Sequence, residues 1–159
     1  MKKCLFTNLA IVVLLMVSAC SPPNYSRNVV ERLKQEGKAY IEEIVRNNEY
    51  KKILERIQNG DAVLIGNSYR LKPGLGDAEY GELRLALAKA LITAPKDVLL
   101  LIPAHFSVKE ICAVSEILPS VEGRKKLVFS AVNSLNHYKE LSQVEEQKKE
   151  CITQLKMSV

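Results

Sequence analysis

Apolar residues recur at steps of three and four along most of this 159-residue chain, and this spacing constrains the fold more than any other feature. Such spacing places apolar side chains on one face of a helix, so it predicts amphipathic helices that bury that face. The first stripe covers residues 30–44 through Gly37, and a second covers residues 50–57 before Asn59 and Gly60 end it. Every segment assigned in this way is helical, which predicts an all-α fold.

The segment that begins at Asp77 carries the strongest helical signal. Residues 82–92 are mostly good helix formers, and their apolar side chains cover more than one face. This pattern predicts a central, buried helix that Asp77 caps, after a turn at residues 73–76. Asp61 is expected to cap a shorter segment over residues 62–71 in the same way.

Further helices are expected in the second half of the chain. The apolar run over residues 98–102 suits a buried strand or a short buried helix, and Pro95, at a first helical position, favours the helix. Ser107-Val108-Lys109-Glu110 fits a capping box, in which serine and glutamate satisfy free N–H groups at a helix start, and Ser142-Gln143-Val144-Glu145 fits a second one. A longer helix follows Pro119. Together these segments predict an irregular bundle of about seven or eight helices.

The N-terminal segment has a different character. Lys2 and Lys3 precede an unbroken apolar run of nine residues at positions 9–17, whereas a membrane-spanning helix needs roughly 20. The run is therefore expected to act as a secretory signal that is removed after export. It closes on Val17-Ser18-Ala19-Cys20, where small residues precede a cysteine.

This closing pattern resembles the lipobox of bacterial lipoproteins, in which the cysteine receives a diacylglyceryl group and the chain is cut before it. The resemblance implies that residues 1–19 are a signal peptide and that residues 20–26 are the lipidated Cys20 and a short tether. It also implies a location in the bacterial cell envelope, at the outer membrane facing the periplasm in a two-membrane bacterium, since Ser21 follows the cysteine. An ordinary secretory peptide cut near Ala19 and a short uncleaved anchor are the alternatives.

Length and charge limit the number of domains and the kind of partner that the rest of the chain can have. Residues 27–159 are enough for a single helical domain with its own core and too few to suggest two. The whole chain has 23 Lys and Arg against 18 Asp and Glu, and removal of Lys2 and Lys3 lowers the net charge from +5 to +3. A charge this small argues against a nucleic-acid partner, and export argues against it further.

The use of cysteine agrees with export. Of four cysteines, Cys4 leaves with the signal and Cys20 carries lipid, so Cys112 and Cys151 remain as one pair in an oxidising compartment. We expect a disulfide that pins the last helix to the body and stabilises the fold by about 4 kcal/mol. Two buried free thiols or a metal pair are the alternatives, although two cysteines without nearby histidines are poor zinc ligands.

Residues typical of catalysis or cofactor binding are sparse. His105 and His137 have no metal-ligand spacing with each other or with a cysteine, so no metal site is expected. Gly74 and Gly76 lack the Gly-Lys-Ser or Gly-Lys-Thr end of a phosphate loop, and turn chemistry explains them. We therefore expect no cofactor and no enzymatic activity.

Two loops are expected to contact a partner, because loops between helices are exposed and commonly carry binding residues. They cover residues 71–80 and 103–106, and His105 is expected to be exposed there. The candidate contact residues are Lys72, Leu75, Asp77, Tyr80, His105 and Phe106.

The leading hypothesis is a membrane-tethered binding or inhibitor module of the cell envelope that acts by occupying a partner protein. Its expected partners are the lipid bilayer, through acylated Cys20, and an envelope protein. The alternative is a structural or assembly lipoprotein that binds peptidoglycan or lipid through the basic clusters at residues 124–126 and 148–149. A small hydrolase that uses His105 is the third hypothesis, but no motif supplies an oriented base for it.

Overall fold

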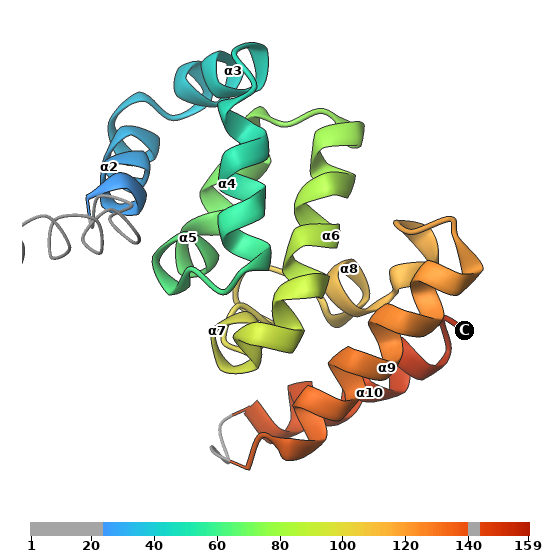
Figure 1. Ribbon diagram of the computed structural model, residues 1–159. Coiled ribbons are helices and arrows are strands. Elements are labelled where there is room, and N and C mark those ends of the chain that lie inside the picture. Colours follow the sequence, from blue (N-terminus) through green and yellow to red (C-terminus); the bar gives the residue numbers. More distant parts are fainter. Residues whose placement is uncertain (1–23, 140–143) are drawn as a thin grey trace, which may run out of the picture.

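The computed structural model describes residues 24–139 and 144–159. Within these residues the chain forms nine α-helices, two 3-10 helices (η) and no strand (Figure 1), which confirms the predicted all-α class. The first half consists of α2 (Tyr25–Glu36), α3 (Lys38–Arg46), α4 (Glu49–Gln58), α5 (Ala62–Asn67) and η1 (Ser68–Gly74). The second half consists of α6 (Asp77–Thr93), α7 (Pro95–Leu99), α8 (Val108–Cys112), η2 (Val114–Glu116), α9 (Val121–His137) and α10 (Glu145–Lys156).

Helix α6 lies at the centre of the molecule. It packs against α4 on one side and against α8 and α9 on the other, and it also contacts α7 (Figure 1). Its side chains Leu83, Leu87 and Leu91 are fully buried. Because burying a leucine contributes about 1.5–3 kcal/mol, α6 is the central core helix that the sequence predicted.

The first predicted helix is divided at Gly37, so the expectation of one helix over residues 30–44 is wrong. Gly37 has a φ of 53° and a ψ of −123°, a conformation that side chains with a Cβ rarely adopt. The chain therefore ends α2 at Glu36 and begins α3 at Lys38. The apolar stripe continues across the break because both helices bury their apolar face, and the division raises the number of helices above the predicted seven or eight.

The folded body begins earlier than predicted. Tyr25 is the first residue of α2, and the Ser26 hydroxyl donates a hydrogen bond to the Asp61 carboxylate. Residues 25 and 26 therefore belong to the domain rather than to the tether. The predicted lipobox and the predicted tether up to residue 23 lie outside the described residues.

The predicted N-terminal caps are correct for α5 and α8. Asp61 accepts a hydrogen bond from the Leu64 N–H at 3.2 Å, and Ser107 and Glu110 form a complete capping box at α8. Asp77 is instead the first residue of α6, and Gly76 takes the cap position. The shift of one residue still leaves the Asp77 carboxylate near the positive end of the helix dipole.

Two predicted helices are shorter than expected, and each is followed by a proline. The segment over residues 62–71 is α-helical only to Asn67 and continues as η1, which contains Pro73. Helix α7 begins at Pro95 as predicted but ends at Leu99 instead of Ile102, ahead of Pro103. A proline has no N–H to donate, and its ring clashes in a helix with the carbonyl four residues earlier, which is at residue 69 for Pro73 and residue 99 for Pro103.

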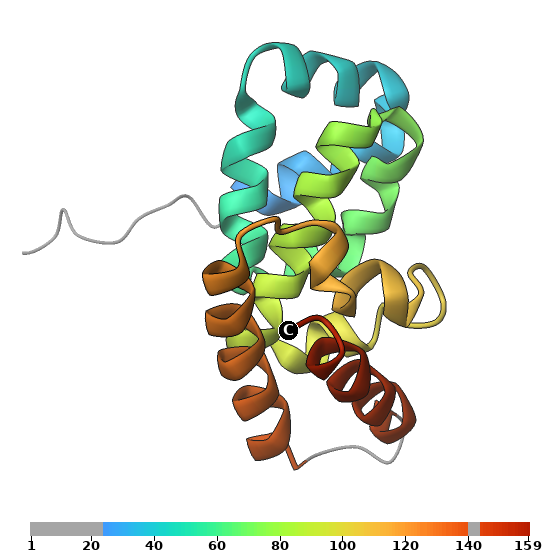
Figure 2. The ribbon, with the colours of Figure 1, turned by 90° about the vertical axis from the view of Figure 1, so that its right-hand side faces the viewer.

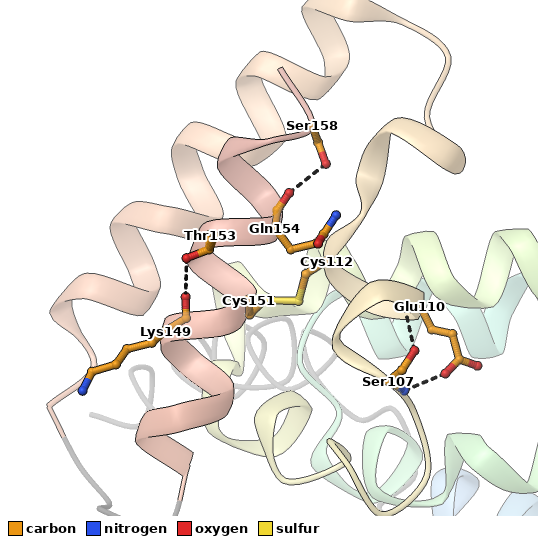
Figure 3. Close-up of a disulfide and its surroundings, with 8 residues drawn as sticks. All are labelled: Ser107, Glu110, Cys112, Lys149, Cys151, Thr153, Gln154 and Ser158. Carbon is orange, nitrogen blue, oxygen red and sulfur yellow. Dashed lines mark hydrogen bonds between the residues drawn. A yellow bond between two sulfur atoms is a disulfide. The ribbon is translucent and has the colours of Figure 1, made fainter.

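A disulfide joins α8 to α10. Cys112 ends α8, Cys151 lies within α10, and their sulfur atoms are bonded as the sequence predicted (Figure 3). Helix α10 packs against both α8 and α9, and Figure 2 shows α9 and α10 on the face turned toward the viewer. Of the second predicted capping box, Ser142 and Gln143 lie outside the described residues.

Candidate functional site

The two loops predicted to contact a partner meet in the structure. Lys72, in η1, extends to the loop after α7, where its Nζ donates to the backbone carbonyl of His105 at 3.0 Å. The same Nζ lies 3.1 Å from Oε1 of Glu110, the third residue of α8. Segments that are 33 and 38 residues apart in sequence therefore form one surface.

Glu110 is the acceptor at the centre of this surface. Its Oε1 accepts hydrogen bonds from the Tyr80 hydroxyl and from Lys72, and its Oε2 accepts one from the Ser107 N–H at 2.6 Å. Burial opposes the charged form of the carboxyl group, but these hydrogen bonds outweigh burial and lower the pKa of Glu110 to about 2. Burial and the Glu110 carboxylate both raise the pKa of Tyr80. At neutral pH, Glu110 is therefore a charged acceptor and Tyr80 a neutral donor.

Arg84, in the second turn of α6, holds α8 and η2 against that helix. Its Nε donates to the backbone carbonyl of Glu110 at 2.6 Å, and its Nη2 lies 3.2 Å from the Glu116 carboxylate. Lys109 approaches the same carboxylate at 3.0 Å. Hydrogen bonds from Lys109 and Arg84 lower the pKa of Glu116, so this ion-paired group keeps its charge at neutral pH.

Tyr69 and His105 form a second contact between the two loops. Their rings are stacked, with centroids 3.7 Å apart and planes inclined by 7°. The guanidinium carbon of Arg70 lies 5.0 Å from the centre of the Tyr69 ring. His105 is exposed, whereas Tyr69 and Arg70 are half-buried. We call Tyr69, Arg70, Lys72, Tyr80 and His105 the aromatic-basic patch.

The three remaining candidate contact residues have different roles. Phe106 is only 1% exposed, so its ring cannot make the contact that the sequence predicted. A phenyl ring gains more from burial than from exposure, and Phe106 lies in the core with Lys72 Nζ 4.5 Å from its centre. Leu75 is half-buried against the core. Asp77 is exposed, at a hollow of about 410 Å³ that Tyr80 also lines.

A groove of about 750 Å³ lies between α8 and α10, and sequence reasoning missed it. Its lining includes Pro103 and Val108 on one side and Lys149 and Thr153 on the other. Figure 3 shows the last two on α10 beside the disulfide, where the Thr153 hydroxyl donates to the Lys149 carbonyl at 3.0 Å. The residue types are ordinary, so only the pairing of two distant cysteines could have indicated that these segments meet.

Features that assign a functional class directly are missing from the described part of the chain. No helix in residues 24–139 or 144–159 is long and apolar enough to cross a membrane. In the same residues, no three His, Cys, Asp or Glu side chains are placed to hold a metal ion. Comparison with protein-family models, curated proteins and solved structures finds no match for this chain. The function is therefore inferred from the residues themselves.

Proposed function

We propose that this protein is a membrane-tethered binding or inhibitor module of the bacterial cell envelope that acts by occupying a partner protein. The aromatic-basic patch carries the proposal, because hydrogen bonds and a ring stack join two loops into one pre-formed surface. Tyrosine and arginine are among the residues that dominate binding energy at protein interfaces. Side chains that are already held in place lose little conformational entropy when a partner binds.

The contacts of the patch favour binding over hydrolysis. His105 stacks on Tyr69, and within the described residues no carboxylate hydrogen-bonds to its imidazole. The Ser107 hydroxyl accepts the Glu110 N–H at 3.1 Å as a helix cap. A serine hydrolase needs a nucleophile bonded to a base and a third group that orients the base. These side chains do not supply that arrangement.

The N-terminal motif supports the membrane part of the proposal. Val17-Ser18-Ala19-Cys20 resembles a lipobox, and two or three acyl chains on Cys20 exceed what stable anchoring requires. Ser21 supports a position at the outer membrane, facing the periplasm, in a bacterium with two membranes. The disulfide agrees with export, because such bonds persist in oxidising compartments.

One observation favours the alternative, a structural or assembly lipoprotein that binds lipid or peptidoglycan. The outer face of α9 presents Phe129, which is 77% exposed, one turn after the exposed Lys125 and Lys126. An apolar ring flanked by lysines suits an anionic surface. Arg124 and Lys148 are less available, because both donate to backbone carbonyls.

Site-specific photo-crosslinking of the full-length protein in intact bacteria tests the two proposals. A benzophenone amino acid is placed at Ala104, which is exposed beside His105, at Phe129 on α9, and at the exposed Lys51 on α4 as a control. We expect one stoichiometric protein adduct from position 104 and none from position 51. Adducts of lipid or peptidoglycan from position 129 alone would support the alternative and contradict the binding proposal.

Lipidation is tested separately by metabolic labelling with radioactive palmitate. The Cys20→Ser variant should lose the label and leave the membrane fraction, because the acceptor thiol is gone. Cys4→Ser removes a cysteine that the proposal places in the discarded signal and should change neither result. A label that persists in Cys20→Ser would contradict the anchor.

A further inference from the structure

Most of the exposed apolar side chains gather around α9. Seven large apolar side chains are exposed in the described part of the chain, and four of them lie on α9 or just after α10: Val121, Phe129, Met157 and Val159. The Arg124 side chain joins these two segments, because its Nε donates to the Ser158 carbonyl at 3.2 Å. Residues 157–159 therefore lie beside the first turn of α9.

Lysines share this surface with the apolar side chains. Val121, Lys125 and Phe129 follow one another at steps of four residues, which places them along one side of α9. Lys126 is exposed next to them. We call Val121, Lys125, Lys126 and Phe129 the α9 face. Glu122 is the single acidic residue in the sequence of α9, so positive charge prevails there.

The short connection to Cys20 limits what the α9 face can meet. Only four residues lie between Cys20 and Tyr25, where the fold begins. A lipid anchor at Cys20 would therefore hold the domain next to the bilayer, because so few residues cannot carry it far away. One side of an anchored domain then lies close to the lipid headgroups.

We propose that the α9 face rests on this bilayer and contacts its anionic phospholipids. The inference rests on the proposed lipid anchor and adds a second contact with the same membrane, one that orients the domain. An apolar ring such as that of Phe129 enters the headgroup region, while lysines beside it stay with the phosphates. Exposed Met157 extends the apolar area, and exposed Lys156 adds to its positive charge.

An anionic bilayer suits the α9 face better than a second copy of the chain. In a two-fold dimer one patch meets itself, so Lys125 and Lys126 would lie opposite the same lysines of the other copy. Like charges in that arrangement repel one another. An anionic leaflet instead attracts every exposed lysine near its surface.

Contact through the α9 face leaves the aromatic-basic patch free for a partner. Figure 2 shows α9 along one edge of the molecule and the loop between α7 and α8 at the opposite edge. That loop includes His105 and receives the hydrogen bond from Lys72. A domain that rests on α9 therefore turns the patch away from the bilayer, toward a partner in the compartment.

Accessibility of a nitroxide spin label tests the contact. The label is attached to Asn133→Cys, which is exposed one turn after Phe129, and in a control to Ala104→Cys on the loop at the opposite edge. Protein purified from bacterial membranes is moved from detergent into vesicles of phosphatidylethanolamine and phosphatidylglycerol. Oxygen concentrates in bilayers, whereas a nickel chelate stays in water. The label at position 133 should gain contact with oxygen and lose contact with nickel, and the label at position 104 should stay in water.

Matched variants assign the effect to the α9 face. Phe129→Ser should lower the ratio of membrane-contacting to free orientations about tenfold, because the apolar ring is lost. Lys125→Gln/Lys126→Gln should lower it about tenfold as well, and only in anionic vesicles at low salt. Lys34→Gln/Lys38→Gln removes two exposed lysines from α2 and α3 and should leave the ratio unchanged. Circular dichroism confirms that each variant is folded.

Three results would overturn the inference. They are a label at position 133 that stays as open to nickel as the label at position 104, equal protection in vesicles of phosphatidylcholine, and protection already present in detergent that grows with protein concentration. The last result would identify a second copy as the occupant of the α9 face.

The palmitate label and the crosslink from position 104 keep this test separate from the proposed function. If both persist while the label at position 133 stays in water, the α9 contact is rejected and the anchored binding module stands. If the palmitate label and attachment to vesicles are absent, the anchor on which the inference rests is rejected as well. Lipid adducts from position 129 together with a protein adduct from position 104 would support both.

Discussion

Helices α2 and α10 lie toward opposite ends of the described chain and are both 12 residues long, yet they are held by different means. Helix α2 buries the apolar side chains of Val29, Val30 and Leu33. Helix α10 buries only Cys151 and Leu155, and the first of these is bonded to α8. One helix depends on its apolar face and the other on a covalent link.

The comparison shows how a helix with little apolar burial is kept in place. Each buried aliphatic side chain contributes about 1.5–3 kcal/mol, so the apolar face of α2 is sufficient to hold it. Helix α10 exposes Glu146, Lys149 and Glu150 and has a smaller apolar contact. The disulfide adds about 4 kcal/mol by restricting the unfolded chain, which offsets that deficit.

The largest effect is expected from removing the disulfide. The double variant Cys112→Ala/Cys151→Ala opens a link across 39 residues of sequence, and it should lower the free energy of unfolding by about 4 kcal/mol. Denaturant unfolding measures the loss. Hydrogen exchange should show α10 losing protection first while α2 keeps it. Equal loss of protection in both helices would contradict the distinction between them.

A smaller effect is expected from Leu33→Ala, which leaves a cavity beneath α2 and should cost about 3 kcal/mol in the free energy of unfolding. Leu155→Ala in α10 is the matched change, since both side chains are buried. Hydrogen exchange distinguishes the two variants. Helix α2 should open locally in Leu33→Ala, whereas the disulfide should keep α10 attached in Leu155→Ala. Local opening of α10 to the same extent would show that the bond does not hold the helix.

The glycine that ends α2 should give an intermediate effect. Gly37→Ala places a Cβ on a residue with a φ of 53°, and it should destabilise the fold by about 1 kcal/mol although nothing lies within 4 Å of the added atom. Gly81→Ala, inside α6 and also free of neighbours, should instead stabilise it by up to about 1 kcal/mol. Thermal unfolding of the two variants isolates the effect of backbone strain, because neither added Cβ is crowded by neighbouring atoms. Equal shifts of Tm would exclude strain at Gly37.

The smallest effect concerns α8, the helix to which α10 is attached. The pKa of Glu110 is about 2 in the folded protein, below its ordinary value of 4.5. Its charged form therefore stabilises the fold above about pH 4.5, and this contribution is lost as the pH falls toward 2. Glu110→Gln should reduce this pH-dependent part of the unfolding free energy by about 0.5 kcal/mol, because solvent screens a partly exposed group. Glu122→Gln, exposed on α9, is the control in the same titration of unfolding free energy.

Features that depend on a few neighbouring residues could be predicted from the sequence. Asp61 and the Ser107-Glu110 pair cap their helices because a side chain three positions away suffices to satisfy a free N–H. The Cys112–Cys151 bond is the exception among long-range contacts, because it was predicted by counting cysteines in a chain expected to be exported. The two loops predicted to contact a partner were chosen because each is a break between helices, and the structure shows that they meet.

Features that arise from tertiary contact could not be predicted. Gly37 continues an apolar stripe of helical period, so periodicity alone hides the break that its positive φ produces. The burial of Phe106 and the ring stack of Tyr69 on His105 depend on segments that meet only after folding. Glu110 was recognised as a cap but not as the acceptor for Tyr80, which is 30 residues away.

Because the fold begins at Tyr25, a lipid anchor at Cys20 would limit how far the domain lies from the bilayer. Four residues lie between Cys20 and Tyr25, and the five steps from one Cα atom to the other span only about 17 Å in a fully extended chain. A lipidated Cys20 would then confine the whole domain to a thin layer next to the bilayer. A partner in that layer meets the domain at a high effective concentration, so even a weak complex would be well populated. A partner that stays deeper in the compartment would never meet it.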